Sequence, residues 1–275
     1  MSAKIRVVAV LIVLCLAAFG AAGAWAQAAA GEAAPVVAEK TPPAAAVTPI
    51  VDQRALDMLK RMSDTLKKAK TVSFQARSLV PIKAPNGMWV SLFSDSRVVM
   101  QEPDKLFVEK RGDVVPLDFY FNGTTVSAYS PTRNVFAEKS VTGTIDALIE
   151  KIDAEGENAF PYADILISDP YTQLTANMVD AIYVGQSTLR GVKTDHLAFT
   201  NKAVEWQIWI GAEDYLPRMV SATYSHGSGD PTYTVEFFEW DIMTQAPAEK
   251  FMYKNTTQAA KVEYRAPTVF RPQQQ

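Results

Sequence analysis

Two histidines, His196 and His226, are the side chains best suited to acid–base chemistry, and a nucleophile and an acid follow the second one closely. The run His226-Gly227-Ser228-Gly229-Asp230 contains the three residue types of a hydrolase triad. A triad needs its base within hydrogen-bond reach of the nucleophile and oriented by a buried acid. Residues this close in a glycine-rich loop seldom meet that condition. We therefore interpret the run as a solvated turn, with a hydrolase using His226 and Ser228 or Asp230 as the alternative.

Other reactive groups are sparse. His196 follows Asp195 within a predicted strand and is interpreted as an ordinary polar strand residue. Cys15 is the single cysteine, and it lies in an apolar leader, so we expect the mature chain to have no disulfide, thiolate metal site or cysteine nucleophile. No histidine pair has zinc-site spacing, and no glycine-rich phosphate loop is present. We predict no catalytic residues, no metal and no cofactor, and hence a protein that is not an enzyme.

The N-terminus has the three parts of a secretory signal peptide. Lys4 and Arg6 precede the uncharged run 7–19, and Ala24-Trp25-Ala26 places small residues at the −3 and −1 positions of a cleavage site. Residues 1–26 are therefore predicted to be removed on export to a bacterial periplasm. The alternative is an uncleaved N-terminal anchor, which the short apolar run disfavours.

Composition divides the remainder. Residues 27–49 are rich in Ala, Pro and Val without an apolar period, which predicts a disordered spacer, and residues 266–275 are predicted to form a flexible tail. Residues 50–265 then form one domain. The chain has 27 basic and 30 acidic residues, and its pI is about 5.5. This balance argues against a nucleic-acid partner.

Helical periodicity occurs at the start and in the middle of the domain. Thr48-Pro49 is predicted to begin a helix, and its apolar stripe is Ala55, Leu56, Leu59, Met62, Leu66 and Ala69. Thr144 is predicted to cap a second helix with an apolar face of Ile145, Leu148, Ile149 and Ile152. Pro161 and Pro170 sit where short helices could begin, the second after a capping Asp169.

Eleven segments have strand character between turn residues. Asn122-Gly123 predicts a type I′ hairpin turn. Short links favour an antiparallel meander, and helices clustered in two places favour coverage of one face of a curved sheet. The predicted strands are Thr71–Leu79, Gly87–Gln101, Lys105–Arg111, Leu117–Phe121, Thr124–Ser130, Asn134–Lys139, Val179–Thr188, Val192–Thr200, Val204–Gly211, Pro217–Ser225 and Thr232–Asp241.

Alternation within the strands predicts one apolar and one polar sheet face. Val204, Trp206, Ile208 and Ile210, for example, oppose Glu205 and Gln207. Such a sheet wraps around a core or around a cavity. Periodicity alone leaves both possibilities open.

Several segments resemble the periplasmic lipoprotein carrier superfamily (LolA/LolB-like). They are MQEPDKLFVE at 100–109, FNGTTVSAYSP at 121–131, the stretch from Trp209-Ile210 to Leu216-Pro217, and the closing segment 247–262. Their order and spacing agree with that superfamily over most of 51–264. Within it, the chain is most similar to the predicted periplasmic family called domain of unknown function 2092.

The resemblance implies a β-rich α+β fold, in which an incomplete antiparallel barrel of about eleven strands carries a helical lid over one face, with a cavity for acyl chains. One departure matters: Glu102 stands where the carriers have an arginine that controls the lid, so their release mechanism is not carried over. The predicted lid face is Leu148, Ile149 and Ile152. The predicted ligand lining is Val90, Leu92, Val98, Met100, Phe119, Phe121, Val126, Trp206, Ile208, Tyr233, Val235 and Phe237.

The functional hypothesis is a soluble, monomeric periplasmic carrier for a lipid or a lipid-anchored protein. Its expected partners are an acyl-chain ligand and, beyond that, lipoproteins or a protein of the inner or outer membrane. The alternative is a lipid-sensing or protein-interaction module of the same fold, because the fold alone does not select among these roles.

Overall fold

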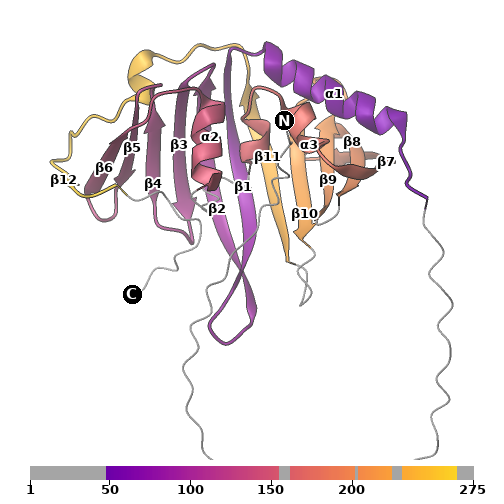
Figure 1. Ribbon diagram of the computed structural model, residues 1–275, viewed down its shortest axis with the longest axis horizontal. Helices are drawn as coiled ribbons and strands as arrows, with labels where there is room; N and C mark the ends of the chain where they lie inside the picture. Colours follow the sequence, from indigo (N-terminus) through magenta and orange to yellow (C-terminus); the bar gives the residue numbers. More distant parts are fainter. Residues whose placement is uncertain (1–47, 155–161, 202–203, 225–230, 265–275) are drawn as a thin grey trace, which may run out of the picture.

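The computed structural model describes residues 48–154, 162–201, 204–224 and 231–264. Its main feature is one twelve-stranded sheet, curved and open, with helices over one face (Figure 1). The strand order is β12-β6-β5-β4-β3-β2-β1-β11-β10-β9-β8-β7, so β12 and β7 are the two edges. The predicted incomplete antiparallel barrel is confirmed. The predicted strand number was one too low, because β12 (Ala260–Lys261) has two residues and pairs parallel to β6.

The other strands form two antiparallel meanders. The first contains β1 (Thr71–Lys83), β2 (Trp89–Gln101), β3 (Lys105–Gly112), β4 (Leu117–Phe121), β5 (Thr125–Ser130) and β6 (Val135–Ser140). The second contains β7 (Met178–Leu189), β8 (Val192–Asn201), β9 (Val204–Gly211), β10 (Pro217–Tyr224) and β11 (Thr232–Asp241). The pairing of β1 with β11 joins the two meanders. Predicted strand boundaries agree within a few residues, except in β1.

β1 continues four residues beyond the predicted end at Leu79, despite Pro81. It pairs with β2 along its whole length, but with β11 only from Ser73 to Leu79. Beyond Leu79, one side of β1 is therefore a sheet edge, where the missing N–H of proline is tolerated. The result is the long β1–β2 hairpin that projects from the sheet in Figure 1.

The Asn122-Gly123 turn differs from the prediction. Gly123 has φ +90°, whereas Asn122 is absent from the residues with positive φ, so the turn is not type I′. The Asn122 side chain instead accepts hydrogen bonds from the backbone N–H groups of Thr124 (3.1 Å) and Thr125 (2.9 Å). These side-chain hydrogen bonds stabilise a turn in which Gly123, but not Asn122, has a positive φ.

Helix α1 (Gln53–Lys68) begins later than predicted, because Val51 forms a parallel bridge with Ala181 and Asp52 caps the helix. Its predicted apolar stripe is confirmed, with Leu56 partly buried and the other five residues buried. α2 (Ile145–Ala154) and α3 (Pro170–Leu174, capped by Asp169) start at the predicted residues, and η1 (Ala163–Ile165) lies between them. The helix proposed to begin at Pro161 lies outside the described residues.

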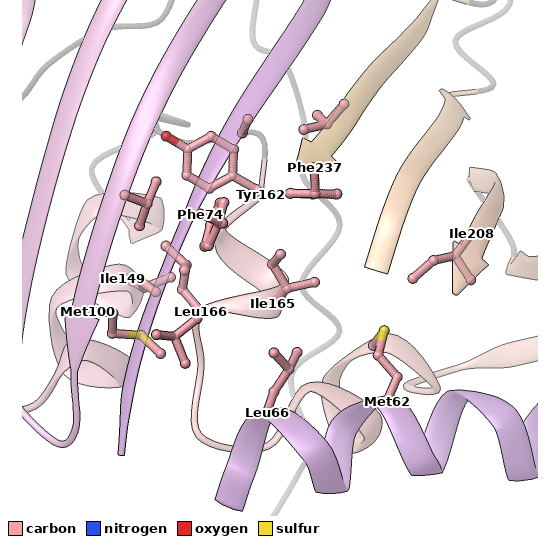
Figure 2. Close-up of a cluster of buried hydrophobic side chains, with 14 of the residues drawn as sticks. Met62, Leu66, Phe74, Met100, Ile149, Tyr162, Ile165, Leu166, Ile208 and Phe237 are labelled. Carbon is pink, nitrogen blue, oxygen red and sulfur yellow. The ribbon is translucent and has the colours of Figure 1, made fainter. Parts of the chain in front are cut away.

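The core lies between the concave face of the sheet and the helices (Figure 2). Phe74 of β1 is central: its ring centroid is 5.8 Å from that of Tyr162 and 5.7 Å from that of Phe237. Met62 and Leu66 of α1 and Ile165 of η1 complete the packing from the helical side. One cluster thus includes residues of both meanders.

The convex face of β3–β6 is covered by the C-terminal segment, which includes η2 (Ala248–Phe251). The Tyr253 ring lies 5.0–5.8 Å from the rings of Tyr120, Tyr129 and Phe136. Lys250 places its ammonium 3.8 Å from the centroid of Phe107, which is buried. This segment leaves the concave face of β3–β6 free for the helices.

Candidate functional site

The concave face holds the predicted ligand lining. Nine of its twelve residues are buried members of the central core: Val98, Met100, Phe119, Phe121, Val126, Trp206, Ile208, Val235 and Phe237. The strand alternation inferred from the sequence therefore brings residues of five strands together. In the structure they contact one another and the helices, and their role as a ligand lining stays a prediction.

Tyr233 is partly buried at the border of this core. Its ring is stacked 5.8 Å from that of Tyr224. Burial raises the pKa of both hydroxyls, that of Tyr224 to about 12. Both hydroxyls are therefore neutral, and the nearby charge of Asp164 raises their pKa values further.

Val90 and Leu92 lie outside the core. They are on the projecting part of the β1–β2 hairpin, where Val90 is 36% exposed and Leu92 is half-buried. Their pairing partners on β1 are Ile82 and Val80. These four aliphatic residues, which we call the hairpin strip, continue the concave face beyond the part that the helices cover.

The predicted lid face is packed against the sheet. Leu148, Ile149 and Ile152 of α2 are all buried in the central core. Figure 2 shows Ile149 in the same cluster as Met100 of β2 and Leu166, which follows η1. α2 is held at its first residue, because Ile145 N–H donates to the carbonyl of Pro103 at 2.9 Å. The helix is positioned as a cover, and its movement stays a prediction.

A pocket of about 350 Å³ opens at the rim where α1, the β2–β3 turn and the segment after η1 meet. We call it the rim pocket. Its walls are apolar at Leu66, Met100 and Ile165, and Lys67 and Lys70 of the α1 end lie at its edge. Lys67 is paired with Asp169 at 3.5 Å. Core residues of α1, β2 and η1 therefore line an opening to solvent.

Glu102, the residue that departs from the lipoprotein carriers, lies in the rim pocket. Burial raises the pKa of its carboxyl, and the nearby charge of Asp146 raises it further, while Lys70 lowers it. An acid at this position therefore faces another acid on α2.

A polar group on the concave face escaped the reasoning from sequence. Ser78 and Ser94, paired across β1 and β2, have their hydroxyl oxygens 2.8 Å apart, and Ser96 is buried beside them. Lys110 of β3 lies opposite Ser96 and is also buried. We call these four residues the polar belt. Strand alternation puts Lys110 on the same face as Leu106 and Val108, but lysine is so seldom buried that the sequence alone does not predict an interior position for it.

The histidines give no catalytic arrangement in the described residues. His196 stacks on Trp209 with a 4.0 Å centroid separation, and its Nε2 is 2.9 Å from the Gln207 side-chain oxygen. Burial lowers the pKa of this imidazole. His226, Ser228 and Asp230 lie outside the described residues. In the part of the chain described, no group of three or more His, Cys, Asp or Glu could hold a metal ion.

Residues 55–264 match the family described as "Predicted periplasmic protein (DUF2092)". The chain belongs to this family. The match covers all eleven long strands and the helices apart from the first two residues of α1, and it confirms the family resemblance found in the sequence. No curated protein matches the chain. Among the described residues, no helix is both long enough and apolar enough to cross a membrane.

Solved structures with a similar fold share little sequence with this DUF2092 chain. The lipoprotein LppX of Mycobacterium tuberculosis is 13% identical, with 70% of this chain and 98% of that chain covered and a TM-score of 0.38. MucB of Pseudomonas aeruginosa is 15% identical, with 76% and 66% covered and a TM-score of 0.42. A LolA superfamily protein of Nitrosomonas europaea is 9% identical, with 72% and 97% covered and a TM-score of 0.33. The strand order and pairing of the sheet itself define the fold of this protein.

Proposed function

We propose that this DUF2092 protein is an exported periplasmic carrier that binds one amphiphile, a lipid or the lipid anchor of a lipoprotein, on its concave face. The family description supports the compartment, and the leader at residues 1–26 supports export through a cleaved signal peptide. Transport, in this proposal, means holding an acyl chain away from water between two membranes.

The proposal rests mainly on the short helical segments that cover the concave face of the sheet. Short helical segments, α2, η1 and α3, lie over the apolar inner residues of the sheet, with the rim pocket beside them. A short amphipathic helix obtains its stability from packing and little from its own propensity. A cover of this kind can separate from the sheet while the strand pairing below it stays intact.

Replacement of the apolar α2 side chains by an acyl chain on the concave face should cost little free energy. Each methylene removed from water contributes about 0.8 kcal/mol. A chain that occupies the space of Leu148, Ile149 and Ile152 restores the apolar contacts that the sheet loses when α2 moves. The net cost of opening is therefore small compared with the cost of exposing the face to water.

Native mass spectrometry of the protein purified from its own periplasm, with extraction and identification of any co-purified lipid, tests the proposal. We expect a bound mass and uptake of a fluorescent fatty acid by the delipidated protein. A protein that is free of ligand when isolated and that takes up no fluorescent fatty acid would contradict the carrier function.

A protein-interaction or sensor module is the second candidate, and the tip of the β1–β2 hairpin favours it. Met88 and Trp89 are exposed there, at 58% and 39%. A photo-crosslinking residue at Met88 separates the two functions. A stable protein adduct whose yield depends on bound lipid supports sensing, whereas adducts with lipid alone support carriage.

A further inference from the structure

Lys110 is a buried cation on the concave face. Strand alternation places it on the same side of β3 as Leu106 and Val108, and only 5% of the residue is exposed. Its backbone partners are Ser96 on β2 and Leu117 on β4. Lysine is rarely buried to this extent without a paired acid. The burial of the Lys110 ammonium therefore requires an explanation.

No carboxylate of the described residues forms an ion pair with Lys110. Burial alone accounts for its lowered pKa, about 8, so the amine is still mainly protonated at pH 7. Lys105, on the same strand, behaves differently: its ammonium pairs with Asp104 at 3.0 Å. An uncompensated buried charge is costly, and a bound anion would remove that cost.

Hydroxyl groups surround the strand position of Lys110. Ser96 lies opposite it and Ser94 two residues further along β2, and both are buried. The Tyr162 hydroxyl, fully buried, interacts with Ser96, and this contact lowers the pKa of a phenol that burial strongly raises. Serine hydroxyls can donate hydrogen bonds to a carboxylate or phosphate oxygen. The polar belt thus supplies one charge and several donors.

The hairpin strip begins where the polar belt ends. From Ser78 and Ser94, the inner face continues to Val80 and Leu92 and then to Ile82 and Val90. At about 3.4 Å per residue, the inner face from Ser94 to Val90 is roughly 14 Å long. The strip is partly exposed, so a chain can lie on it first, before α2 moves and the chain takes the place of Leu148, Ile149 and Ile152. The Lys110 ammonium next to the apolar hairpin strip is therefore a suitable site for an anionic amphiphile.

We propose that Lys110 binds the anionic head group of an amphiphile whose acyl chain lies on the hairpin strip. Ser94 and Ser96 donate hydrogen bonds to the same head group. The inference rests on the proposed function and adds the charge class of the ligand and the position of its polar end. Carboxylate and phosphate share the required chemistry, so both a fatty acid and a phospholipid are possible sources.

Binding of three probes to the delipidated full-length protein tests the proposal: dodecanoate, dodecyl phosphate and the uncharged dodecanol, each by isothermal titration at pH 7. We expect both anions to bind at least tenfold more tightly than dodecanol. The tighter of the two anions indicates whether a fatty acid or a phospholipid is the source. This comparison needs no variant, so it stands even if a substitution prevents folding.

Substitutions then test whether Lys110 contacts the head group. Lys110→Met should reduce affinity for both anions at least tenfold and leave dodecanol unchanged, and Lys110→Arg should restore much of the loss. Lys105→Met, on the same strand but already paired with Asp104, is the matched control and should change neither affinity. Val90→Asp should weaken all three probes.

The outcomes separate the two claims. If all three probes bind equally well and Lys110→Met changes none of them, the carrier function stands and the role of Lys110 is wrong. If no probe binds, the carrier function fails and this inference fails with it. An equal loss of dodecanoate and dodecanol in Lys110→Met would also overturn the head-group role, because the substitution would then act on the fold.

Discussion

The backbone N–H of Ser168 donates a 2.9 Å hydrogen bond to Asp146, which joins the first turn of α2 to the segment between η1 and α3. The Ser168 hydroxyl donates to the same carboxylate. Together with the bond from Ile145 to Pro103, this contact fixes the N-terminal end of α2 at the rim pocket. α2 is therefore held by polar contacts at one end and by apolar packing along its length.

Asp146→Ala should loosen this attachment. Loss of the shared acceptor is expected to lower the free energy of unfolding by about 1 kcal/mol. We also expect faster amide exchange in α2 and faster uptake of a fluorescent fatty acid. Lys151→Ala, at an exposed position of the same helix, is the control. Reduced stability with an unchanged uptake rate would mean that α2 does not limit entry.

Ile149→Glu distinguishes a mobile cover from fixed core. An unpaired carboxylate kept in the core costs several kcal/mol. If α2 can swing away, the glutamate reaches water, so we expect the protein to melt cooperatively with a modest loss of stability and to take up no lipid. Thermal melting and a fluorescent-lipid titration measure both effects, with Lys151→Glu as the exposed control. Collapse of the melting transition together with binding would assign the segment to the core.

Glu102→Arg should strengthen the closed rim. Burial and the charge of Asp146 raise the pKa of Glu102, which places the two acids in mutual repulsion. An arginine there would be attracted to Asp146, so we expect a several-fold slower release of preloaded fluorescent fatty acid. Glu102→Gln, which removes repulsion without adding attraction, should have a smaller effect. Combining Glu102→Arg with Asp146→Asn should cancel the slowing, and its persistence would rule out this pair as the cause.

Lys110→Met should stabilise the free protein, and the gain should depend on pH. Burial lowers the pKa of Lys110 from 10.5 to about 8. Below pH 8 the cost of the buried charge is fully present, and the shift corresponds to at most roughly 3.5 kcal/mol. Between pH 8 and 10.5 the unfolded chain binds more protons than the native one, so the stability of the unmodified protein rises with pH.

The gain from Lys110→Met should therefore be largest at pH 7 and disappear near pH 10.5. Urea unfolding at pH 7, 9 and 10.5 measures it, with Lys105→Met as the control. A variant no more stable than the parent protein at pH 7 would show that the ammonium is solvated in the native state.

The sequence predicted most of the strand pattern because turn residues and period-two alternation agree along this chain. Leu117–Phe121, Val204–Gly211 and Thr232–Asp241 have the predicted boundaries in the structure. β1 was predicted too short because Pro81 is a strand breaker unless the strand is at an edge, and edge status depends on which strand pairs beside it. That pairing involves residues about 160 positions apart and is invisible to a local pattern.

The candidate site was predicted in part. Alternation identified the inner face correctly, so nine of the predicted lining residues meet in one core. The same rule placed Val90 and Leu92 on this face, but it could not show that the hairpin projects beyond the helices. The polar belt was not predicted, because its significance depends on the lack of a paired carboxylate near Lys110 among the described residues. Only the three-dimensional arrangement shows which acids lie near a given amine.

The single seam between β1 and β11 has a consequence for the order of folding. Every other long-strand pairing connects neighbours in the chain, so each meander can form locally as the polypeptide emerges N-terminus first. Closure of the seam waits for β11, after more than 150 further residues have been made, and long-range closure of this kind is slow. Until then one side of β1 is an unprotected edge, open to pairing with another chain. β1 is therefore exposed to mispairing until β11 has been made.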